Sequence, residues 1–377
     1  MKTPFVFGRL AKDNNFTDRT EETGHLVRNF KSLINTILIS PRRWGKSSLV
    51  FKAAEISRKE EADLRVCMVD LFNVRTEEQF YNALAQSVIS STANKWEEAM
   101  ANAARFLSRF VPKVSFGNNL QSELTIELNI DEVRRSPDEI LDLAEKLAVE
   151  KKLRVVICID EFQNIATFGE PLAFQKKLRS HWQRHQNVSY CLYGSKRHMM
   201  LQVFTDSSMP FYKFGDIFFL EKIKTPEWVK FIKVRFADTG KSISEEICEE
   251  IVSRAENHPY YVQQLAQQVW LRTEKEATIE AINEAHIDIT AQLSLMFDTI
   301  TQTLTNQQIC LLRAMSADEK KLTSKAVMDR YNLASPTMIS RARKALLEKD
   351  ILDNVAGTYS FQDPIYAYWL KKQYFGL

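Results

Sequence analysis

The stretch Ser40–Val50, SPRRWGKSSLV, directly follows the apolar run NTILI and carries the strongest signal in this sequence. A phosphate-binding loop needs inward-facing backbone N–H groups, a lysine that reaches the β- and γ-phosphates, and a hydroxyl that binds Mg²⁺. Lys46 and Ser47 supply the lysine and the hydroxyl, and Gly45 allows the backbone to approach the phosphates. An apolar strand before the loop and a helical pattern after it are the context in which such loops occur.

Ser40 stands where this pattern normally has glycine, which tolerates dihedral angles that a Cβ disfavours. A serine is small enough to reshape the loop without closing it. Two interpretations therefore remain at this point: a variant nucleotide site, or a strand–turn–helix with an incidental Gly-Lys-Ser. The candidate phosphate-binding residues are Ser40, Pro41, Arg42, Arg43, Trp44, Gly45, Lys46, Ser47 and Ser48.

A second motif, RVVICIDEF at 154–162, is an apolar run that ends in the paired acids Asp160 and Glu161. Isolated charges are costly at the end of a buried strand, and the carboxyl edge of a parallel sheet is where α/β folds bind ligands. We expect Asp160 and Ser47 to hold Mg²⁺ and Glu161 to polarise the attacking water. A strand that simply ends at a charged surface turn is the alternative. Because both motifs occur in the expected order, we favour a site for ATP and Mg²⁺.

The pattern of apolar and helical segments predicts a doubly wound α/β domain with right-handed crossovers. Near-continuous apolar runs, typical of parallel strands buried on both faces, alternate with helical patterns. The runs lie at 35–40, 64–71, 153–162 and 187–195, and the helical patterns at 45–57, 76–91 and 171–185. Residues 94–137 interrupt this rhythm, with a helix expected around 96–110 and a hairpin from KVSF to ELTIELN.

The rest of the chain is predicted to form two smaller domains. After DIFFLEKI the sequence becomes almost purely helical, and from about Thr305 three short helices precede two extended segments joined at Ala356-Gly357. That order is typical of a winged helix-turn-helix. We therefore predict a P-loop ATPase core over 1–222 with an insertion near 94–137, a helical lid domain over 223–300, and a winged-helix domain over 301–377.

Composition excludes several classes of protein. Of the 377 residues, 45% are hydrophobic and 26% charged, which is the balance of a globular chain rather than a disordered one. The net charge of +3 is too small for nucleic-acid binding by bulk charge alone. No signal peptide or membrane-length apolar window is found, and three of the five cysteines lie in strand-like runs. We expect a cytoplasmic protein with no membrane partner.

Two further patterns carry weaker hypotheses. His181 and His185 are four residues apart, but no third ligand is near in sequence, so a solvated helix face is favoured over a zinc site. In the predicted winged helix, Ser335 would cap a recognition helix that presents Arg341, Arg343 and Lys344 outward. Acidic residues nearby leave this patch weakly basic. Duplex DNA, a protein partner or self-association therefore all remain open.

Several motifs together resemble the archaeal-type ATPase family of prokaryotes, a STAND/AAA+-like group of P-loop ATPases near the Orc/Cdc6 branch. The motifs are FTDRTEETGHLVRNF, SPRRWGKSSL, VVICIDEFQNI, NHPYYVQQLA and YSFQDPIYAYWL, so the resemblance covers nearly the whole chain. An acid followed at once by a glutamate also resembles the additional-strand, catalytic-glutamate class of these ATPases. The resemblance implies ATP hydrolysis with Mg²⁺.

The resemblance also implies individual roles. Phe16 and Arg19 would lie beside the adenine, Ser195 would sense the γ-phosphate, and Pro259 would belong to the lid, with Asn257 in place of the family's glycine. Glu161, Lys46 and Ser195 are thus the expected catalytic residues. The predicted function is an ATPase that uses ATP as a conformational switch coupled to the winged helix. The alternative is a nucleotide-stabilised DNA-binding regulator or protein-interaction scaffold with little or no turnover.

Overall fold

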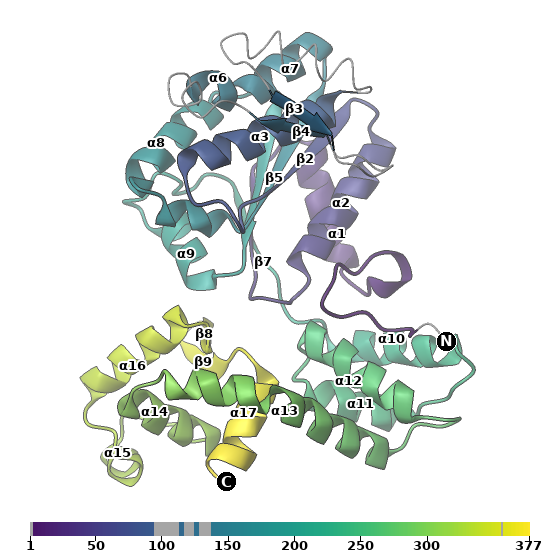
Figure 1. Cartoon of the computed structure of the whole chain (residues 1–377), viewed down its shortest axis with the longest axis vertical. Helices are drawn as coiled ribbons and strands as arrows, with labels where there is room; N and C mark the ends of the chain where they lie inside the picture. Colours follow the sequence, from purple (N-terminus) through teal and green to yellow (C-terminus); the bar gives the residue numbers. More distant parts are fainter. Residues whose placement is uncertain (1–2, 94–112, 117–123, 128–136, 356) are drawn as a thin grey trace. The chain divides into compact units, whose positions relative to one another are not determined.

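The computed structural model describes residues 3–93, 113–116, 124–127, 137–355 and 357–377 (Figure 1). The chain forms two compact units: Arg19–Glu221, and Met1–Asp18 together with Lys222–Leu377. We call them the sheet unit and the helical unit. Across the described residues, no helix combines the length and apolar content that a bilayer crossing needs.

The sheet unit is built on a five-stranded sheet with the order β2-β5-β6-β1-β7, and every adjacent pair is parallel. Its strands are β1 (Thr36–Ile39), β2 (Leu64–Asp70), β5 (Arg154–Asp160), β6 (Val188–Gly194) and β7 (Asp216–Phe219). All residues of β1 and β6 are buried, which explains their continuous apolar sequences. The predicted α/β class with a parallel sheet is confirmed.

Helices cover both faces of this sheet (Figure 1). Helices α1 and α2 contact each other on one side, and the remaining helices contribute to a core cluster on the other side. The helices are α1 (Thr20–Lys31), α2 (Lys46–Glu60), α3 (Glu77–Thr92), α6 (Pro137–Leu141), α7 (Leu143–Lys151), the 3₁₀ helix η2 (Phe162–Thr167), α8 (Pro171–Trp182) and α9 (Arg197–Thr205). This arrangement leaves the loops after the strands at one edge of the sheet, where ligands of α/β folds bind.

The predicted insertion is partly described. Strands β3 (Lys113–Phe116) and β4 (Leu124–Glu127) form an antiparallel pair, as the alternating sequence predicts. The helix expected around 96–110 lies outside the described residues.

The helical unit contains helices throughout and one small sheet. Its helices are the 3₁₀ helix η1 (Asp13–Asn15), α10 (Thr225–Ala237), α11 (Glu245–Arg254), α12 (Pro259–Arg272), α13 (Ile279–Gln302), α14 (Asn306–Ser316), α15 (Lys325–Tyr331), α16 (Pro336–Glu348), α17 (Pro364–Trp369) and the π-helix η3 (Leu370–Tyr374). Strands β8 (Leu352–Val355) and β9 (Thr358–Phe361) are antiparallel. One apolar core runs through α10 to η3, so the helical region and the C-terminal segments pack as one body.

The N-terminal segment packs in this helical unit. The Phe5 ring lies 6.1 Å from that of Phe231 and 5.8 Å from that of Phe236, in edge-to-face geometry. The amide of Val6 donates to Gln263 Oε1 at 2.9 Å. The predicted division places this segment with the ATPase core, whereas its contacts are with α10 and α12. The division into three domains stays a prediction.

The C-terminal elements have the predicted order of three helices and two strands. Ser335 caps α16 by accepting a hydrogen bond from Met338 N at 3.2 Å, as predicted. Arg341 and Lys344 are exposed on α16. Arg343, expected to point outward, is instead half-buried with its guanidinium 4.6 Å from the Tyr359 ring of β9. The prediction for Arg343 is wrong because cation–π packing against the hairpin holds this side chain.

Candidate active site

The loop between β1 and α2 adopts a conformation in which Ser40 needs no glycine. Positive φ angles occur at Arg43 (64°) and Gly45 (92°), where Gly45 is the N-cap of α2, and not at Ser40. Ser40 is completely buried, and its Oγ donates to Pro41 O at 3.0 Å. The serine therefore fits the start of this loop without backbone strain. Lys46 begins α2, so the N-terminal N–H groups of this helix face the loop.

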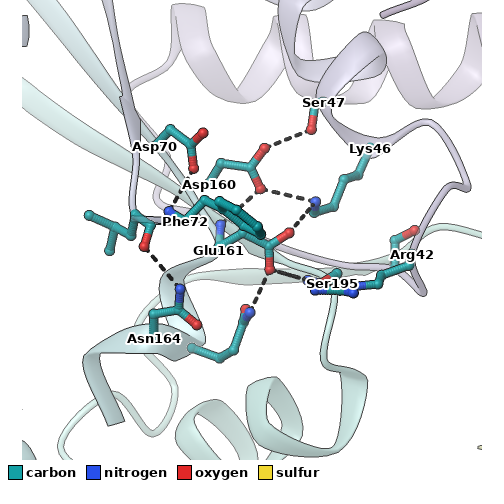
Figure 2. A network of polar contacts seen from close by, with 12 residues as sticks. Arg42, Lys46, Ser47, Asp70, Phe72, Asp160, Glu161, Asn164 and Ser195 are labelled. Atoms are coloured by element: carbon teal, nitrogen blue, oxygen red, sulfur yellow. Dashed lines mark hydrogen bonds and ion pairs between the residues drawn. The ribbon is translucent and has the colours of Figure 1, made fainter. Parts of the chain in front are cut away.

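The two acids at the end of β5 meet the first residues of α2 (Figure 2). Lys46 Nζ lies 3.0 Å from Asp160 Oδ1 and 2.9 Å from Glu161 Oε1. Ser47 Oγ donates to Asp160 Oδ2 at 2.7 Å. The structure thus brings together the four residues that the two sequence motifs single out.

The second oxygen of Glu161 is held from the other side. Ser195, directly after β6, donates to Glu161 Oε2 through Oγ at 2.7 Å and through its amide at 3.3 Å. Gln163 Nε2 donates to the same oxygen. Arg42 Nε also donates to Ser195 Oγ at 3.5 Å, which connects the phosphate loop to this group (Figure 2). Both carboxylate oxygens of Glu161 are therefore engaged.

Gln163 is the site residue that the sequence analysis missed. It is 1% exposed and lies in η2, the 3₁₀ turn that carries its side chain back toward Glu161. A Cβ at Gly194 would stand 1.9 Å from Gln163 Oε1, so only glycine fits at this last position of β6. The sequence shows an amide side chain two residues after Glu161, but the direction in which that side chain points depends on the 3₁₀ turn η2.

Glu161 itself has a positive φ of 52°, an unusual conformation for a residue with a side chain. This left-handed geometry costs about 1 to 2 kcal/mol for a residue other than glycine. Strain of this kind clusters at functional sites, where the surrounding contacts hold it. Here those contacts come from Lys46, Ser195 and Gln163.

The electrostatics of the site follow from burial and from Lys46. Burial opposes the ionisation of Glu161, but the positive charge of Lys46 and the donated hydrogen bonds outweigh it and lower the pKa of Glu161 to about 2. For Asp160, burial prevails and raises the pKa above its usual value. Burial would lower the pKa of Lys46, but the charges of Asp160 and Glu161 raise it. Lys46 and Glu161 are thus both charged at neutral pH.

The remaining predicted site residues are distributed between the two units. Arg19 begins the sheet unit as N-cap of α1, and it is buried with its Nη1 donating to Glu22 Oε1 at 2.7 Å. Phe16 follows η1 in the helical unit, and Pro259 is the buried first residue of α12. Asn257 has a φ of 59°, which asparagine tolerates better than most residues. The nucleotide contacts of Phe16, Arg19 and Pro259 stay predictions.

The expected solvated face of His181 and His185 is not found. His181 is 7% exposed, and the side chain of His185 is 3% exposed. Both lie close to Asp142 Oδ1, at 2.7 Å from His181 Nδ1 and 3.2 Å from His185 Nε2. This carboxylate offsets the cost of burying two imidazoles. Among the described residues, no group of three or more His, Cys, Asp or Glu side chains is arranged to hold a metal ion.

A parallel sheet with a glycine–lysine–serine loop after one strand and paired acids after another defines the P-loop NTPase-like class of α/β folds. The chain is similar to the Walker-type ATPase of Pyrococcus abyssi, with a TM-score of 0.65 and 19% identity over 98% of this chain and 100% of that one. This likeness gives the chain the fold of a Walker-type ATPase over its full length, as predicted.

Other comparisons concern the C-terminal part and more distant structures. Residues 295–372 match the family described as a probable winged helix domain, which confirms the predicted winged helix. The Aeropyrum pernix ORC2 protein in ADPNP–ADP complexes has a TM-score of 0.48, 15% identity and coverage of 98% and 97%. The ORC1 protein of the same organism in complex with DNA has a TM-score of 0.49, 12% identity and coverage of 96% and 94%. No curated protein matches the chain.

Proposed function

We propose that this chain is an ATPase that binds ATP with Mg²⁺ at the loop before α2 and uses hydrolysis as a conformational switch coupled to its winged helix. The observation that supports this proposal most strongly is the placement of Glu161. Its carboxylate lies at the carboxyl edge of the parallel sheet beside Lys46 and is fixed by Ser195 and Gln163. A fixed, ionised carboxylate at this position can orient the water that attacks the γ-phosphate.

Ser47 and Asp160 fit a Mg²⁺ ion by the chemistry of their donor atoms. A hydroxyl oxygen and a carboxylate oxygen lie 2.7 Å apart next to the phosphate loop, and Mg²⁺ prefers such hard oxygen ligands together with phosphates and water. The ion would neutralise charge on the phosphates during their transfer. Asp160 would hold it with Ser47, while Lys46 would bind the phosphates.

Nucleotide binding is expected to rearrange the contacts of Lys46. The phosphates compete with Glu161 for the ammonium group, and Glu161 Oε1 is then free to accept a hydrogen bond from water. Ser195 and Gln163 keep Oε2 in place during this exchange. Ser195, which also contacts Arg42, would sense the γ-phosphate. Phe16 and Arg19 would bind the adenine, and Pro259 would report nucleotide state through a lid formed by α10 to α12.

The order of the strands supports the additional-strand, catalytic-glutamate class for this ATPase. Strand β6 lies between β1, which precedes the phosphate loop, and β5, which ends in the paired acids. Its last residues place Ser195 against Glu161. A water-orienting glutamate and a sensor on the intervening strand are the features that we assign to this class.

Mg²⁺-dependent release of phosphate from ATP tests the proposal. We expect Glu161→Gln to lower turnover by about 10²- to 10⁴-fold while ATP still binds, because the variant loses only the group that orients water. Glu170→Gln, an exposed acid at the start of α8, is the matched control and should retain turnover. Equal turnover in wild type and Glu161→Gln would exclude the catalytic role. Tight ATP binding without turnover in wild type would favour the nucleotide-stabilised regulator.

Contact with duplex DNA is a second candidate activity, supported by exposed cations around α16. Arg341 and Lys344 of α16 are exposed, as are Lys320, Lys321 and Lys325 at or before the start of α15. Such side chains are suited to phosphate contacts. We expect binding of duplex DNA to weaken as salt increases, and Arg341→Ala to reduce both the affinity for DNA and its salt dependence. Absence of DNA binding at low salt would leave a protein partner or self-association for the winged helix.

A further inference from the structure

The main chain of Asp160 and Glu161 is tied to the segment after β2 by three hydrogen bonds. The amide of Leu71 donates to Asp160 O at 3.1 Å, and the amide of Asn164 in η2 donates to Glu161 O at 2.9 Å. Between them, Asn164 Nδ2 donates to Leu71 O at 2.9 Å (Figure 2). Asn164 therefore closes a ring of contacts that contains the peptide bond between the paired acids.

This ring replaces a bond that the sheet would otherwise make. The hydrogen bonds of a parallel ladder are evenly spaced, so after the bond from Leu71 N to Asp160 O the next would run from Phe162 N to Leu71 O. Glu161, with its φ of 52°, turns the chain out of the sheet before that bond can form. The side chain of Asn164 supplies the donor to Leu71 O instead.

The conformation of Glu161 depends on contacts of this kind. A left-handed residue other than glycine persists only where the surrounding structure holds it. Among the contacts of its carboxylate is Lys46, whose ammonium group is expected to turn to the phosphates when ATP binds. The main-chain contacts through Asn164 are not affected by that exchange. They therefore hold Glu161 in the state in which it must orient water.

The surroundings of Asn164 favour a local effect over a general one. Its neighbours Phe162 and Ile165 are completely buried and anchor η2 in the core of the sheet unit. Asn164 itself is half-buried. Leu71 O also accepts from Val74 N at 3.2 Å, so this carbonyl keeps a partner when the side chain of Asn164 is removed. A substitution at position 164 should therefore displace Glu161 without unfolding the sheet unit.

We propose that Asn164 is a positioning residue for Glu161, which it holds in the left-handed conformation by joining η2 to the carbonyl of Leu71. This role rests on the proposed ATPase function, because its effect is on the carboxylate that orients water. The side chain must be a donor, since a carbonyl oxygen only accepts. An aspartate of the same size has no N–H to offer and would repel Leu71 O.

Steady-state ATP hydrolysis by the full chain tests the role of Asn164. We expect Asn164→Ala to lower kcat by about 10- to 100-fold, because small displacements of a catalytic group have effects of this size. KM for ATP should stay within about twofold, since the phosphate loop is unchanged. Asn164→Asp, which keeps the size but not the donor, should give the same result. Exposed Thr167→Ala is the matched control, because it removes the bond from Thr167 Oγ1 to Asn164 O within the same helix and should retain kcat.

Combination with Glu161→Gln separates positioning from a general loss of structure. If Asn164 acts through Glu161, Asn164→Ala should lower single-turnover hydrolysis by less than about twofold in the Glu161→Gln background. An equal reduction in both backgrounds overturns the proposal.

Unchanged kcat in Asn164→Ala and Asn164→Asp, with turnover still lost in Glu161→Gln, overturns this role alone and leaves the ATPase function intact. Absence of turnover in wild type overturns both. Thermal unfolding establishes that each variant is folded, and if Asn164→Ala does not fold, Asn164→Asp replaces it with the same expected outcomes.

Discussion

At the carboxyl edge of the sheet, Lys46, Glu161 and Ser195 satisfy one another's charges and hydrogen bonds, whereas beside α13 His286 and Ser316 present atoms without a partner. We call this first cluster the closed site, because its charged and polar groups already have partners within the protein. A ligand that enters it must exchange protein contacts for its own. Beside α13 the cost of unsatisfied buried groups is already present in the folded chain. The two regions should therefore respond in opposite ways to mutation.

The largest expected effect comes from Lys46→Ala, which removes the cation of the closed site. Two carboxylates lose their cation, and we expect the free energy of unfolding to fall by about 3 to 5 kcal/mol. ATP affinity should fall at least ~100-fold, about 3 kcal/mol, because the main phosphate ligand is gone. Urea denaturation and nucleotide titration measure the two effects. Lys52→Ala, on the same helix with an exposed partner 3.8 Å away, should change stability by less than about 1 kcal/mol. ATP affinity within threefold of wild type would contradict the role of Lys46.

The buried imidazole of His286 should make stability depend on pH. Its pKa is about 4 in the folded chain against 6.5 for the free side chain, so between these values the unfolded chain binds more protons. Stability from this residue is complete above pH 6.5 and is lost as pH falls toward 4. The loss should be on the order of 3 kcal/mol in wild type relative to His286→Phe, measured by urea denaturation from pH 7 to 4. Parallel pH profiles of the two proteins would contradict this prediction.

Gly194→Ala should disturb the closed site indirectly, because the added methyl group displaces Gln163. The new Cβ would stand 1.9 Å from Gln163 Oε1, and overpacking of this kind costs about 1 to 3 kcal/mol. Gln163 would then release Glu161, and turnover should drop. Adding Gln163→Ala should restore most of the stability but not the turnover. Gly169→Ala, which meets no atom within 4 Å, is the control for a glycine change alone. Unchanged turnover in folded Gly194→Ala would argue against a positioning role for Gln163.

The smallest effects should have opposite signs at two serines. Ser47→Ala removes the donor to Asp160 and should destabilise the chain by about 1 kcal/mol. Ser316→Ala removes an unpartnered buried hydroxyl and should stabilise the chain by about 1 kcal/mol. Urea denaturation of both variants under one condition measures the difference. Changes of the same sign would mean that Ser316 has a partner in solution.

Sequence patterns located the closed site because its residues occur in short motifs at the ends of strands. Lys46 and Ser47 are adjacent, as are Asp160 and Glu161, and the alternation of strands and helices brings both pairs to one edge. The fifth strand, β7, was not among the predicted runs, since it is a short edge strand and only partly buried. Gln163 was missed because its role depends on the 3₁₀ turn that follows Glu161.

Features that depend on partners distant in sequence could not be derived. The spacing of His181 and His185 indicates one helical face, but burial of that face depends on Asp142, which lies 39 residues before His181. A cavity in the helical unit is lined mainly by α11, α13, α14 and α17, which no local pattern connects. Similarly, Arg343 is held by Tyr359 of the following hairpin. In each case tertiary packing decides the environment of a side chain whose sequence neighbours are uninformative.

The attachment of the N-terminal segment to α10 and α12 has a consequence for synthesis of the chain. Val6 emerges from the ribosome 257 residues before Gln263, its partner. At roughly 5 to 20 residues per second, this delay lasts roughly 10 to 50 s. All five strands of the parallel sheet lie between Val6 and Gln263 in the sequence, so the sheet unit can fold before Gln263 has been synthesised. During that time Phe5 and Phe7 lack the rings of α10 and α12 that they contact in the folded chain, so they are exposed apolar side chains to which a chaperone can bind.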